Sequence, residues 1–360
     1  MRRLQVKSSA GEYAVMVGRG AWRTLRRLQG YTSAFVLTEP NLWARWGGKF
    51  ARDTGWGRVR PILVPSGESS KSLTLVGHVA SELLERGADR RSLLVALGGG
   101  VVGDLGGFVA STYMRGIDYV QAPTTVLAQV DSALGGKTAV NIRAMKNLVG
   151  TFYAPRLVVS DPAVLASLSP RGFQSGLYEA VKHAIVSGPA LFAWLEGKVA
   201  GLRPRHTALL ETLVARAAQV KVDVVSRDER EAALRRILNL GHTYGHALEE
   251  ATGYRRFLHG EAVAWGMLLV THLAELVGVL DPAVGQRIAH LVRAVGPLPQ
   301  IRTLSEKKVL GLLPRDKKAV GGRIHWVLAE GIGKVRVTPD VPDVAVARAF
   351  RDVQRGGWDD

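Results

Sequence analysis

Short apolar, β-rich runs alternate with helical patterns in the first half of the chain. Between residues 71 and 86, apolar positions recur at helical spacing. Strands that alternate with helices in this way are typical of a mostly parallel sheet covered by helices. The β-rich runs are Tyr13–Val17, Ala34–Thr38, Pro61–Val64 and Ser92–Leu97.

The pattern changes after about Pro162, where long amphipathic segments follow one another. We therefore expect an α/β, Rossmann-like N-terminal domain over residues 1–161 and an all-α C-terminal domain over residues 162–360. Two late β-like runs, 324–328 and 335–338, are typical of a hairpin around Gly331 and Gly333. The amphipathic segments are Gly172–Val186, Thr207–Val225, Arg230–Ala251, Glu261–Val277 and Pro282–Val295.

Composition restricts the chemistry that the chain can use. Its 360 residues, 47% hydrophobic and 22% charged, are ordinary for two globular domains. The chain has no cysteine, which excludes disulfides, thiolate ligands and cysteine nucleophiles, so a metal ion would need His, Asp or Glu. The N-terminus lacks the apolar core of a signal peptide, and no apolar run is long enough to span a bilayer. We expect a cytoplasmic protein without membrane contact.

The chain is strongly basic, with a formal net charge of +17. The basic residues are scattered, and no zinc-finger spacing, RNP-like motif or basic tail accompanies them. This favours surface arginine together with a pocket for an anionic small molecule. A protein that binds nucleic acid or an acidic surface remains a remote alternative.

A glycine-rich turn follows the buried-strand pattern of residues 93–97. Gly98, Gly100 and Gly103 match the spacing of dinucleotide-binding loops, and a helical pattern opens directly after them. Glycines let the backbone approach a pyrophosphate, and the helix N-terminus supplies amide donors. The alternative is a plain strand-to-helix turn.

Dinucleotide sites usually carry an acidic residue at the end of the next strand. Asp118 lies at about the expected distance but precedes its strand, so it matches poorly. Glu39 follows the run Ala34–Thr38, at a strand end where α/β sheets bind ligands. The sequence predicts a dinucleotide site that departs from the standard Rossmann arrangement.

Several other turns carry groups suited to anions. Residues 67–72 and 123–125 combine turn chemistry with helix starts, and Asp131 and Lys137 flank a glycine turn. Lys146 and Asn147 follow soon after. Lysines beside glycine turns suit phosphate or carboxylate capture, although each lysine alone is typical of a solvated surface.

Three histidines lie close together in the second half of the chain. His242 and His246 are four residues apart, so a helix would place them on one face, and His259 follows. Imidazole is a common ligand of catalytic metals, although pairs at this spacing are often only packed or solvated. Glu179 lies on one helical face with Lys182 and His183, and would suit a two-histidine, one-carboxylate site.

Charged residues precede these histidines. Arg235 is seven residues before His242, which predicts roughly the same helical face, and its guanidinium can grip a carboxylate with two hydrogen bonds. Lys221 and Glu231 lie nearby in the sequence. The alternative for Glu231 and Arg235 is a salt-bridged helix surface.

Taken together, these residues resemble the 3-dehydroquinate synthase family of sugar phosphate cyclases, over nearly the whole chain. The motifs that carry the resemblance are Gly67-Glu68 with Lys71-Ser72, Gly98 to Asp104, Tyr113 to Ile117, Pro123-Thr124-Thr125, Asp131 with Gly136-Lys137-Thr138, Lys146-Asn147, Glu179 to Lys182, Asn239 with Gly241-His242 and Gly245-His246, and His259-Gly260-Glu261.

The resemblance implies a role for each matching residue. Glu179, His242 and His259 would bind one divalent metal ion, zinc or cobalt, which leaves His246 as a substrate-side acid/base group. Further catalytic groups would be Glu231, Lys137, Asn147 and Lys182. The NAD contacts would be Glu39, Asn41, Glu68, Lys71, Gly99, Gly100, Val101, Asp104, Thr124, Thr125 and Lys146. The substrate contacts would be Arg115, Asp131, Lys137, Asn147, Lys182, Lys221, Arg235, Asn239, His246 and Lys317, with Lys318 as the alternative to Lys317.

The implied reaction belongs to the shikimate pathway of aromatic amino acid biosynthesis. A phosphorylated sugar acid, 3-deoxy-D-arabino-heptulosonate 7-phosphate, would lose phosphate and close to 3-dehydroquinate, with NAD oxidising and then reducing the same molecule. Arg115 would reach the phosphate in a neighbouring subunit, which implies a homodimer. Another sugar phosphate cyclase or a metal-dependent polyol dehydrogenase is the alternative enzyme.

Overall fold

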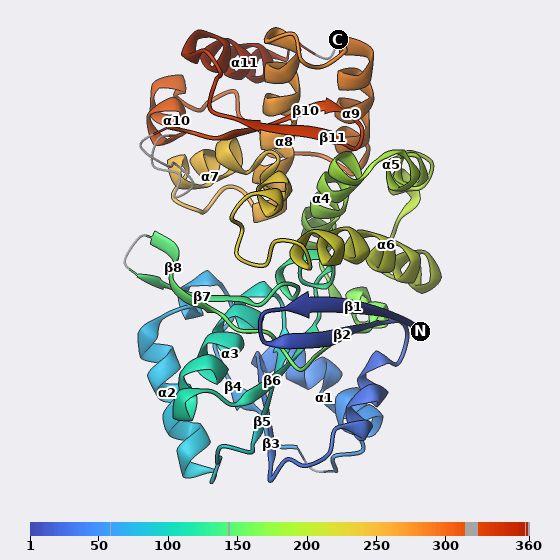
Figure 1. Cartoon of the computed structure of the whole chain (residues 1–360), viewed down its shortest axis with the longest axis vertical. Helices are drawn as coiled ribbons and strands as arrows, with labels where there is room; N and C mark the ends of the chain where they lie inside the picture. The colour runs from blue at the N-terminus through green and yellow to red at the C-terminus, as the bar shows by residue number, and fades with distance from the viewer. Residues whose placement is uncertain (58, 143–144, 314–322, 357, 359–360) are drawn as a thin grey trace. The chain divides into compact units, whose positions relative to one another are not determined.

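The computed structural model of the chain describes residues 1–57, 59–142, 145–313, 323–356 and 358. It divides into two compact units, Met1–Leu168 with Pro204–Arg230, and Ser169–Arg203 with Glu231–Asp360 (Figure 1). Residues 204–230, which were expected in the helical domain, therefore belong to the first unit. Their helix α6 (Thr207–Val225) contacts β1 and β2 of the sheet. Helical periodicity identifies the helix but not the core on which it packs.

The first unit contains a seven-stranded sheet in the order β1-β2-β9-β6-β5-β3-β4. The pair β1 and β2 is antiparallel, and all other neighbours in this sheet are parallel. This confirms the predicted α/β domain with a mostly parallel sheet. The strands are β1 (Arg2–Ser8), β2 (Gly11–Val17), β3 (Ala34–Thr38), β4 (Ile62–Leu63), β5 (Leu93–Gly98), β6 (Asp118–Pro123) and β9 (Leu157–Ser160).

Helices cover both faces of this sheet because its central strands are apolar on both sides. In β5, Leu94 and Ala96 join the core that contains α2 (Leu73–Glu85) and α3 (Gly100–Thr112). Val95 and Leu97 join the opposite core, with Phe50 of α1 and Trp22 of the 3-10 helix at 21–27. Figure 1 shows α1 (Pro40–Thr54) on the side of the strands away from α2 and α3.

The chain changes direction between β3 and β5. These strands are neighbours, yet the chain continues from β3 to β4 on one side and from β5 to β6 on the other. Such a point leaves a crevice at the carboxyl ends of the two strands, where α/β sheets bind ligands. Glu39 follows β3 and Gly98 ends β5, so both predicted nucleotide contacts lie at this point.

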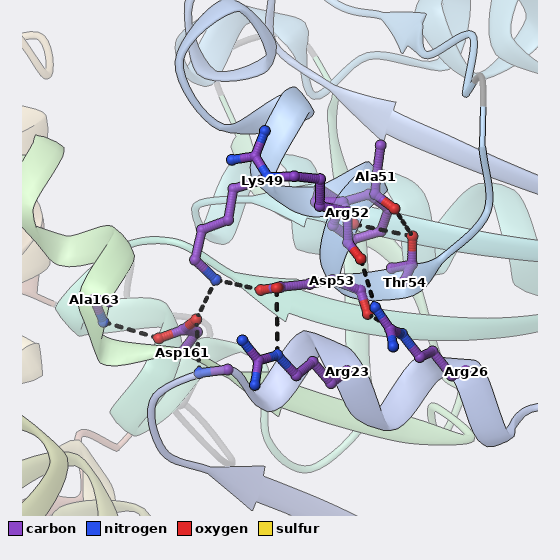
Figure 2. Close-up of polar contacts among 11 residues, drawn as sticks. Arg23, Arg26, Lys49, Ala51, Arg52, Asp53, Thr54, Asp161 and Ala163 are labelled. Atoms are coloured by element: carbon purple, nitrogen blue, oxygen red, sulfur yellow. Dashed lines mark hydrogen bonds and ion pairs between the residues drawn. The ribbon is translucent and has the colours of Figure 1, made fainter.

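A buried ion cluster holds α1 against the sheet. Lys49 forms ion pairs with Asp53 and with Asp161, which directly follows β9 (Figure 2). Asp161 is fully buried, and its Oδ2 accepts hydrogen bonds from Lys49 Nζ at 2.8 Å and from the Gly20 N–H at 3.0 Å. Its Oδ1 accepts from the Ala163 N–H at 3.0 Å. One side chain thus ties together α1, the turn after β2 and the helical turn after β9.

A second, two-stranded sheet carries several predicted contacts in the first unit. It is formed by β7 (Lys137–Ile142) and β8 (Met145–Phe152), which pair antiparallel. Neither strand was predicted, because β8 is exposed along most of its length and lacks the alternation of a half-buried strand.

The second unit is mainly helical, as expected for the C-terminal domain. It also contains the predicted hairpin, formed by β10 (Trp326–Gly331) and β11 (Lys334–Thr338). Within the described ranges, no helix is both long and apolar enough to cross a membrane. The helices are α4 (Pro170–Ser187), α5 (Pro189–Glu196), α7 (His242–Ala251), α8 (His259–Leu276), α9 (Pro282–Ala294), α10 (Glu306–Leu312) and α11 (Asp343–Arg355).

The expected continuous helix over Arg230–Ala251 is wrong. A 3-10 helix covers Leu234–Asn239, and the chain then turns at Gly241, which has a φ of 78°. Arg235 therefore does not share a helical face with His242. A Cβ at Gly241 would lie 2.6 Å from the backbone nitrogen of Met267, so contact with α8 sets the position of the break.

Candidate active site

The glycine turn after β5 has the predicted strand–turn–helix form. Gly99 caps α3, whose first amides are unpaired within the helix. A Cβ at Gly98 would lie 2.4 Å from Cβ of Val102, and one at Gly103 would lie 2.7 Å from Oε1 of Gln121. Close packing against Val102 therefore requires glycine at position 98, whereas a Cβ at position 103 would displace the end of the Gln121 side chain. The turn can present backbone amides and the positive end of α3 to a phosphate.

Lys71 is the centre of a polar network beside this turn. It is 3% exposed and donates hydrogen bonds to Asp104 Oδ2 at 2.6 Å and to Asn147 Oδ1. Glu68 Oε1 lies 3.7 Å from Lys71 Nζ and accepts a hydrogen bond from Asn141 Nδ2 at 2.9 Å. The structure thus brings together three predicted NAD contacts and one predicted substrate contact.

Burial raises the pKa of Asp104, and the Lys71 ammonium partly opposes that rise. Lys71→Met should leave this carboxyl without its cation and reduce the free energy of unfolding by about 1.5–3 kcal/mol near neutral pH. Because the folded pKa is raised, the folded state binds more protons than the unfolded state, so acid favours folding at this group. The deficit of the variant should therefore shrink as the pH falls.

Urea unfolding of wild type and Lys71→Met at pH 7 and at mildly acidic pH measures this effect. Lys307→Met, on the exposed side of α10, is the matched control and should change little. An equal deficit for Lys71→Met at both pH values would contradict the assigned pairing with Asp104.

Other predicted NAD contacts surround the carboxyl edge of the sheet. Glu39 caps α1 and accepts a hydrogen bond from Ser66 Oγ at 2.9 Å, and Asn41 is exposed on the first turn of that helix. The Thr124 N–H donates to the carbonyl of Gly98 at 2.9 Å, and Thr125 Oγ1 accepts from the Ala128 N–H at 3.1 Å. Val101 lies on the first turn of α3, and Lys146 is partly buried on β8.

A π-helix at Ala128–Ser132 carries Asp131. Asp131 forms an ion pair with Lys221 of α6, which is 7% exposed. This contact adds to the packing of α6 against β1 and β2, and it joins two predicted substrate contacts. Lys137 begins β7 and is exposed. Asn147 has a φ of 52°, and its N–H donates to Asn141 Oδ1 at 2.8 Å.

Arg115 lies in a strained turn after α3. Met114 and Arg115 have φ values of 49° and 71°, and Gly116 follows with 124°. Two successive non-glycine residues in the left-handed region cost of order 1–3 kcal/mol each and often mark functional positions. The Arg115 side chain is exposed.

In the second unit, three side chains from three helices converge on one point. Glu179 of α4 is 1% exposed, and its Oε1 lies 3.9 Å from His242 Nε2 and 3.6 Å from His259 Nε2. These separations approach the roughly 3.3 Å expected between ligand atoms about 2 Å from a tetrahedral zinc ion. Glu179 Oε2 forms an ion pair with Lys182, and Oε1, which faces the two histidines, accepts no hydrogen bond from the described residues, so Oε1 suits a cation.

The other ring nitrogens of these histidines have oxygen partners. His242 Nδ1 lies 3.2 Å from the carbonyl of Leu240, and His259 Nδ1 lies 3.2 Å from Glu249 Oε2. Such contacts fix the tautomer of metal-binding histidines, so that each Nε2 faces the ion. The predicted set Glu179, His242 and His259 is therefore brought together with the donor atoms of a metal site.

Glycines allow the three helices to approach this closely. A Cβ at Gly260 would lie 1.8 Å from the carbonyl oxygen of Ser175, and one at Gly266 would lie 1.8 Å from that of Gly241. Glu261 fixes the start of α8 by accepting a hydrogen bond from the Leu258 N–H at 2.7 Å. The Arg171 guanidinium donates hydrogen bonds to both Glu261 oxygens, at 2.6 and 2.8 Å. These contacts hold His259 at the first residue of the helix.

His246 takes a different position. Its ring centroid lies 5.6 Å from that of His242 and 6.1 Å from that of His259. It does not belong to the group formed with Glu179, but it could share a cation with Glu249 and His259. The helical spacing of His242 and His246 thus correctly places them together, and does not by itself identify the carboxylate partner.

The remaining predicted substrate contacts of the second unit lie near the same helices. Lys182 is 1% exposed and forms an ion pair with Glu179. Arg235 is 3% exposed, which excludes the alternative of a solvated helix surface for this residue. Asn239 Nδ2 donates to Glu231 Oε1, and Glu231 has a φ of 61°. Lys317 and Lys318 lie outside the described residues.

Sequence reasoning missed several residues that shape these sites. Glu249 contacts His259, and Arg171 contacts Glu261. Each of these contacts joins residues that are distant in the sequence. Gln129 is fully buried in the π-helix, and its Nε2 donates to the carbonyls of Pro123 and Asp161 at 3.0 and 3.1 Å. Gln129 could have been recognised from the sequence, because it is a polar residue between the apolar Ala128 and Val130. No local pattern marked the other two.

Comparison with known proteins assigns the family. Residues 61–175 match the model of the 3-dehydroquinate synthase N-terminal domain, and residues 176–319 match that of the 3-dehydroquinate synthase C-terminal domain. The chain belongs to the 3-dehydroquinate synthase family. A 3-dehydroquinate synthase from Koribacter versatilis is 45% identical over 361 residues, which is 98% of each chain. This confirms the family resemblance seen in the sequence motifs.

Solved structures of related cyclases share the fold of this 3-dehydroquinate synthase family member. A 2-deoxy-scyllo-inosose synthase, solved with carbaglucose-6-phosphate, NAD+ and Co2+, is 25% identical with a TM-score of 0.87 and 98% and 99% coverage of the two chains. The 2-epi-5-epi-valiolone synthase ValA from Streptomyces hygroscopicus subsp. jinggangensis 5008, solved with NAD+ and Zn2+, is 28% identical with a TM-score of 0.86 and 96% and 97% coverage.

Proposed function

We propose that this chain converts 3-deoxy-D-arabino-heptulosonate 7-phosphate to 3-dehydroquinate and phosphate, as a carbon–oxygen lyase that uses NAD and one divalent metal ion. The observation that carries the proposal is the buried Glu179 carboxylate facing Nε2 of His242 and of His259, in a chain that matches both domains of the family. Zinc or cobalt suits this donor set.

The metal ion would be held by Glu179, His242 and His259. When bound, such an ion acts as a Lewis acid that lowers the pKa of the substrate hydroxyls, and NAD provides a reversible hydride acceptor. Lys182 forms an ion pair with Glu179, so it lies within reach of an anionic substrate held beside the ion. The two related cyclases solved with NAD+ and with Co2+ or Zn2+ support this pair of cofactors.

The NAD pyrophosphate would bind at the N-terminus of α3, where Gly99, Gly100 and Val101 expose backbone amides. Asp104 and Lys71 would lie beside the same turn, where their ion pair fixes the position of each side chain. Glu39 follows β3 at the edge where a ribose hydroxyl group is expected in α/β dinucleotide sites. Glu68, Asn41, Thr124, Thr125 and Lys146 are the remaining proposed contacts.

The charges suit a substrate with two anionic ends. Lys182 and Arg235 are both nearly fully buried in the second unit, and Lys221 is buried in the first. Lys182 is paired with Glu179 and Lys221 with Asp131, and these cations would bind a substrate carboxylate or phosphate beside their present partners. Cations placed to bind a carboxylate favour the 3-dehydroquinate synthase substrate, which carries one, over the substrates of sibling cyclases, which do not.

We propose that His246 and Glu231 transfer protons. His246 is half-buried on the same helix as His242, with its ring 5.6 Å from that ligand, which suits a substrate-side acid or base. Glu231 accepts a hydrogen bond from Asn239, so a carboxylate and an amide are presented together. Lys137 and Asn147, with Lys182, are the further groups proposed to contact the reacting substrate.

A comparison of substrates tests this proposal against its closest alternative. The metal-loaded protein with NAD should turn over 3-deoxy-D-arabino-heptulosonate 7-phosphate, and should act far less well on a ketose phosphate of equal length without the carboxylate. A preference for the carboxylate-free sugar would assign the chain to another cyclase. Oxidation of a polyol with net NADH accumulation would instead indicate a polyol dehydrogenase.

We also propose that the enzyme is a homodimer. Large apolar side chains are exposed on β8 and on the turn before Gly116, both in the first unit. Several exposed large apolar side chains on one edge strand are typical of an interface. The same turn carries Arg115, which would reach the substrate phosphate of the neighbouring subunit. The exposed residues are Met114, Met145, Leu148, Val149 and Phe152.

Arg115→Ala should lower kcat/KM by about 10²-fold or more while leaving NAD affinity unchanged, because the guanidinium that would bind the substrate phosphate is lost. Mixing Arg115→Ala with a His259→Ala variant tests the cross-subunit role. A mixed dimer would regain one intact site, so statistical exchange should restore about a quarter of wild-type activity. No restoration after demonstrated exchange would contradict the cross-subunit contact.

A further inference from the structure

The imidazole of His259 lies between two buried carboxylates from different helices. Its Nε2 is 3.6 Å from Glu179 Oε1, and its Nδ1 is 3.2 Å from Glu249 Oε2. Glu249 is 3% exposed and lies on α7, two turns after His242. Residues seven apart on a helix share a face, so α7 presents a metal ligand and this carboxylate on the same side.

We propose that Glu249 is a positioning residue of the metal site, whose carboxylate accepts the Nδ1 proton of His259 and directs Nε2 to the ion. The proposal rests on the metal site of the proposed function. A carboxylate partner fixes both the tautomer and the orientation of a metal-binding imidazole, and makes it a stronger electron donor.

The two proposed histidine ligands differ in the partner of their Nδ1 atom. The Nδ1 of His242 faces the neutral carbonyl of Leu240 at 3.2 Å, whereas that of His259 faces a carboxylate. His259 is also the more exposed ligand, with its side chain 36% exposed against 11% for His242. Packing therefore orients His242, and His259 depends more on its hydrogen-bond partner. Loss of Glu249 should act mainly through His259.

Charge supports the same assignment. A metal ion on Nε2 withdraws electron density from the imidazole and strengthens the Nδ1–H donor toward Glu249. The Glu249 carboxylate should therefore contribute more to the metal-loaded protein than to the apoprotein, which separates this role from simple packing.

One geometric alternative uses the same residues. His246, Glu249 and His259 also bring ligand atoms close enough to hold a cation, with Glu249 as a direct ligand. That arrangement would leave the buried Glu179 outside the coordination shell, although its Oε1 faces Nε2 of both His242 and His259 and accepts no hydrogen bond from the described residues. We favour the arrangement that uses Glu179, and the alternative is an outcome of the test.

The test is the metal affinity of full-length Glu249→Gln, measured with Zn2+ by chelator competition. We expect the Kd to rise about 10- to 100-fold, which lowers the stabilisation by saturating zinc by about 1.4–2.7 kcal/mol. Glu250→Gln, the same change at the next position of α7, should keep the wild-type Kd. Glu249→Asp, which keeps the charge, should recover part of the affinity.

Two further measurements separate the possible outcomes. Unfolding of the apoproteins should give Glu249→Gln and Glu250→Gln similar stability, and the Co2+ absorption spectrum of Glu249→Gln should keep the coordination number of wild type. Glu179→Gln should change that spectrum and lose tight binding. An unchanged Zn2+ Kd in Glu249→Gln, or a loss as complete as in Glu179→Gln, would overturn the positioning role. Failure of the wild type itself to bind Zn2+ would instead refute the proposed metal site.

Discussion

Replacing His259 with alanine should abolish tight binding of the metal ion and reduce turnover by about 10³-fold or more. The reason is geometric, because His259 supplies one of the two Nε2 atoms that face Glu179, at 3.6 Å from its Oε1. Two remaining donors cannot complete the three protein ligands typical of a catalytic zinc site. Metal content after dialysis and steady-state kinetics with added metal measure both effects.

The control for this variant is His290→Ala, which removes an exposed imidazole from α9. It should retain the metal and the activity of wild type. NAD titration provides a second control, because the first unit carries the proposed NAD contacts and should bind NAD in both variants. Full metal retention in His259→Ala would contradict the assigned ligand set.

The largest effect on stability is expected at Asp161. Asp161→Ala should lower the free energy of unfolding by about 3–5 kcal/mol, because it removes one partner of a buried ion pair. It also leaves the N–H groups of Gly20 and Ala163 without the acceptor that now lies 3.0 Å from each. Urea unfolding followed by tryptophan fluorescence suits this measurement, since Lys49 Nζ lies 4.7 Å from the centroid of the Trp22 ring.

An exposed ion pair provides the comparison for Asp161. Asp340 pairs with Arg323 at 2.8 Å, but its side chain is 76% exposed. Asp340→Ala should therefore change stability by less than about 1 kcal/mol. Asp161→Asn keeps a carbonyl acceptor and should fall between the two alanine variants. Equal stability losses for Asp161→Ala and Asp340→Ala would contradict the assigned role of the buried cluster.

Local patterns were sufficient for much of the first unit. The apolar run at Leu93–Leu97 and the glycines after it predicted the central strand, the turn and the start of α3, because all three depend on neighbouring residues. The edge strand β1 was missed although its buried Leu4 and Val6 alternate with exposed polar residues, because two apolar positions are too few to mark a strand. The hairpin β7–β8 was missed because much of β8 is exposed and its apolar residues follow no core pattern.

The metal group illustrates the limit of local patterns. Helical spacing correctly associates His242 with His246, but Glu179 and His259 come from other helices. Only the packing of α4, α7 and α8 at Gly260 and Gly266 brings them together. Resemblance to the family supplied the ligand set before the structure did. Glu249 matched no assigned motif, and its contact with His259 became visible only in three dimensions.

Spacing also misplaced Arg235. Its separation from His242 fits two helical turns, but the helix breaks at Gly241, where α8 approaches too closely for a side chain. Periodicity assumes that a helix continues, and nothing local to residues 230–251 shows the backbone of α8. Burial of Arg235 nevertheless supports its expected role as a buried cation rather than a surface group.

The most direct test of the proposed function is phosphate release from 3-deoxy-D-arabino-heptulosonate 7-phosphate by the purified, metal-loaded protein with a catalytic amount of NAD. We predict release that requires both NAD and the metal ion, without net NADH, and a product that a dehydroquinase converts further. No phosphate release from a protein that binds both NAD and the metal ion would contradict the proposed function.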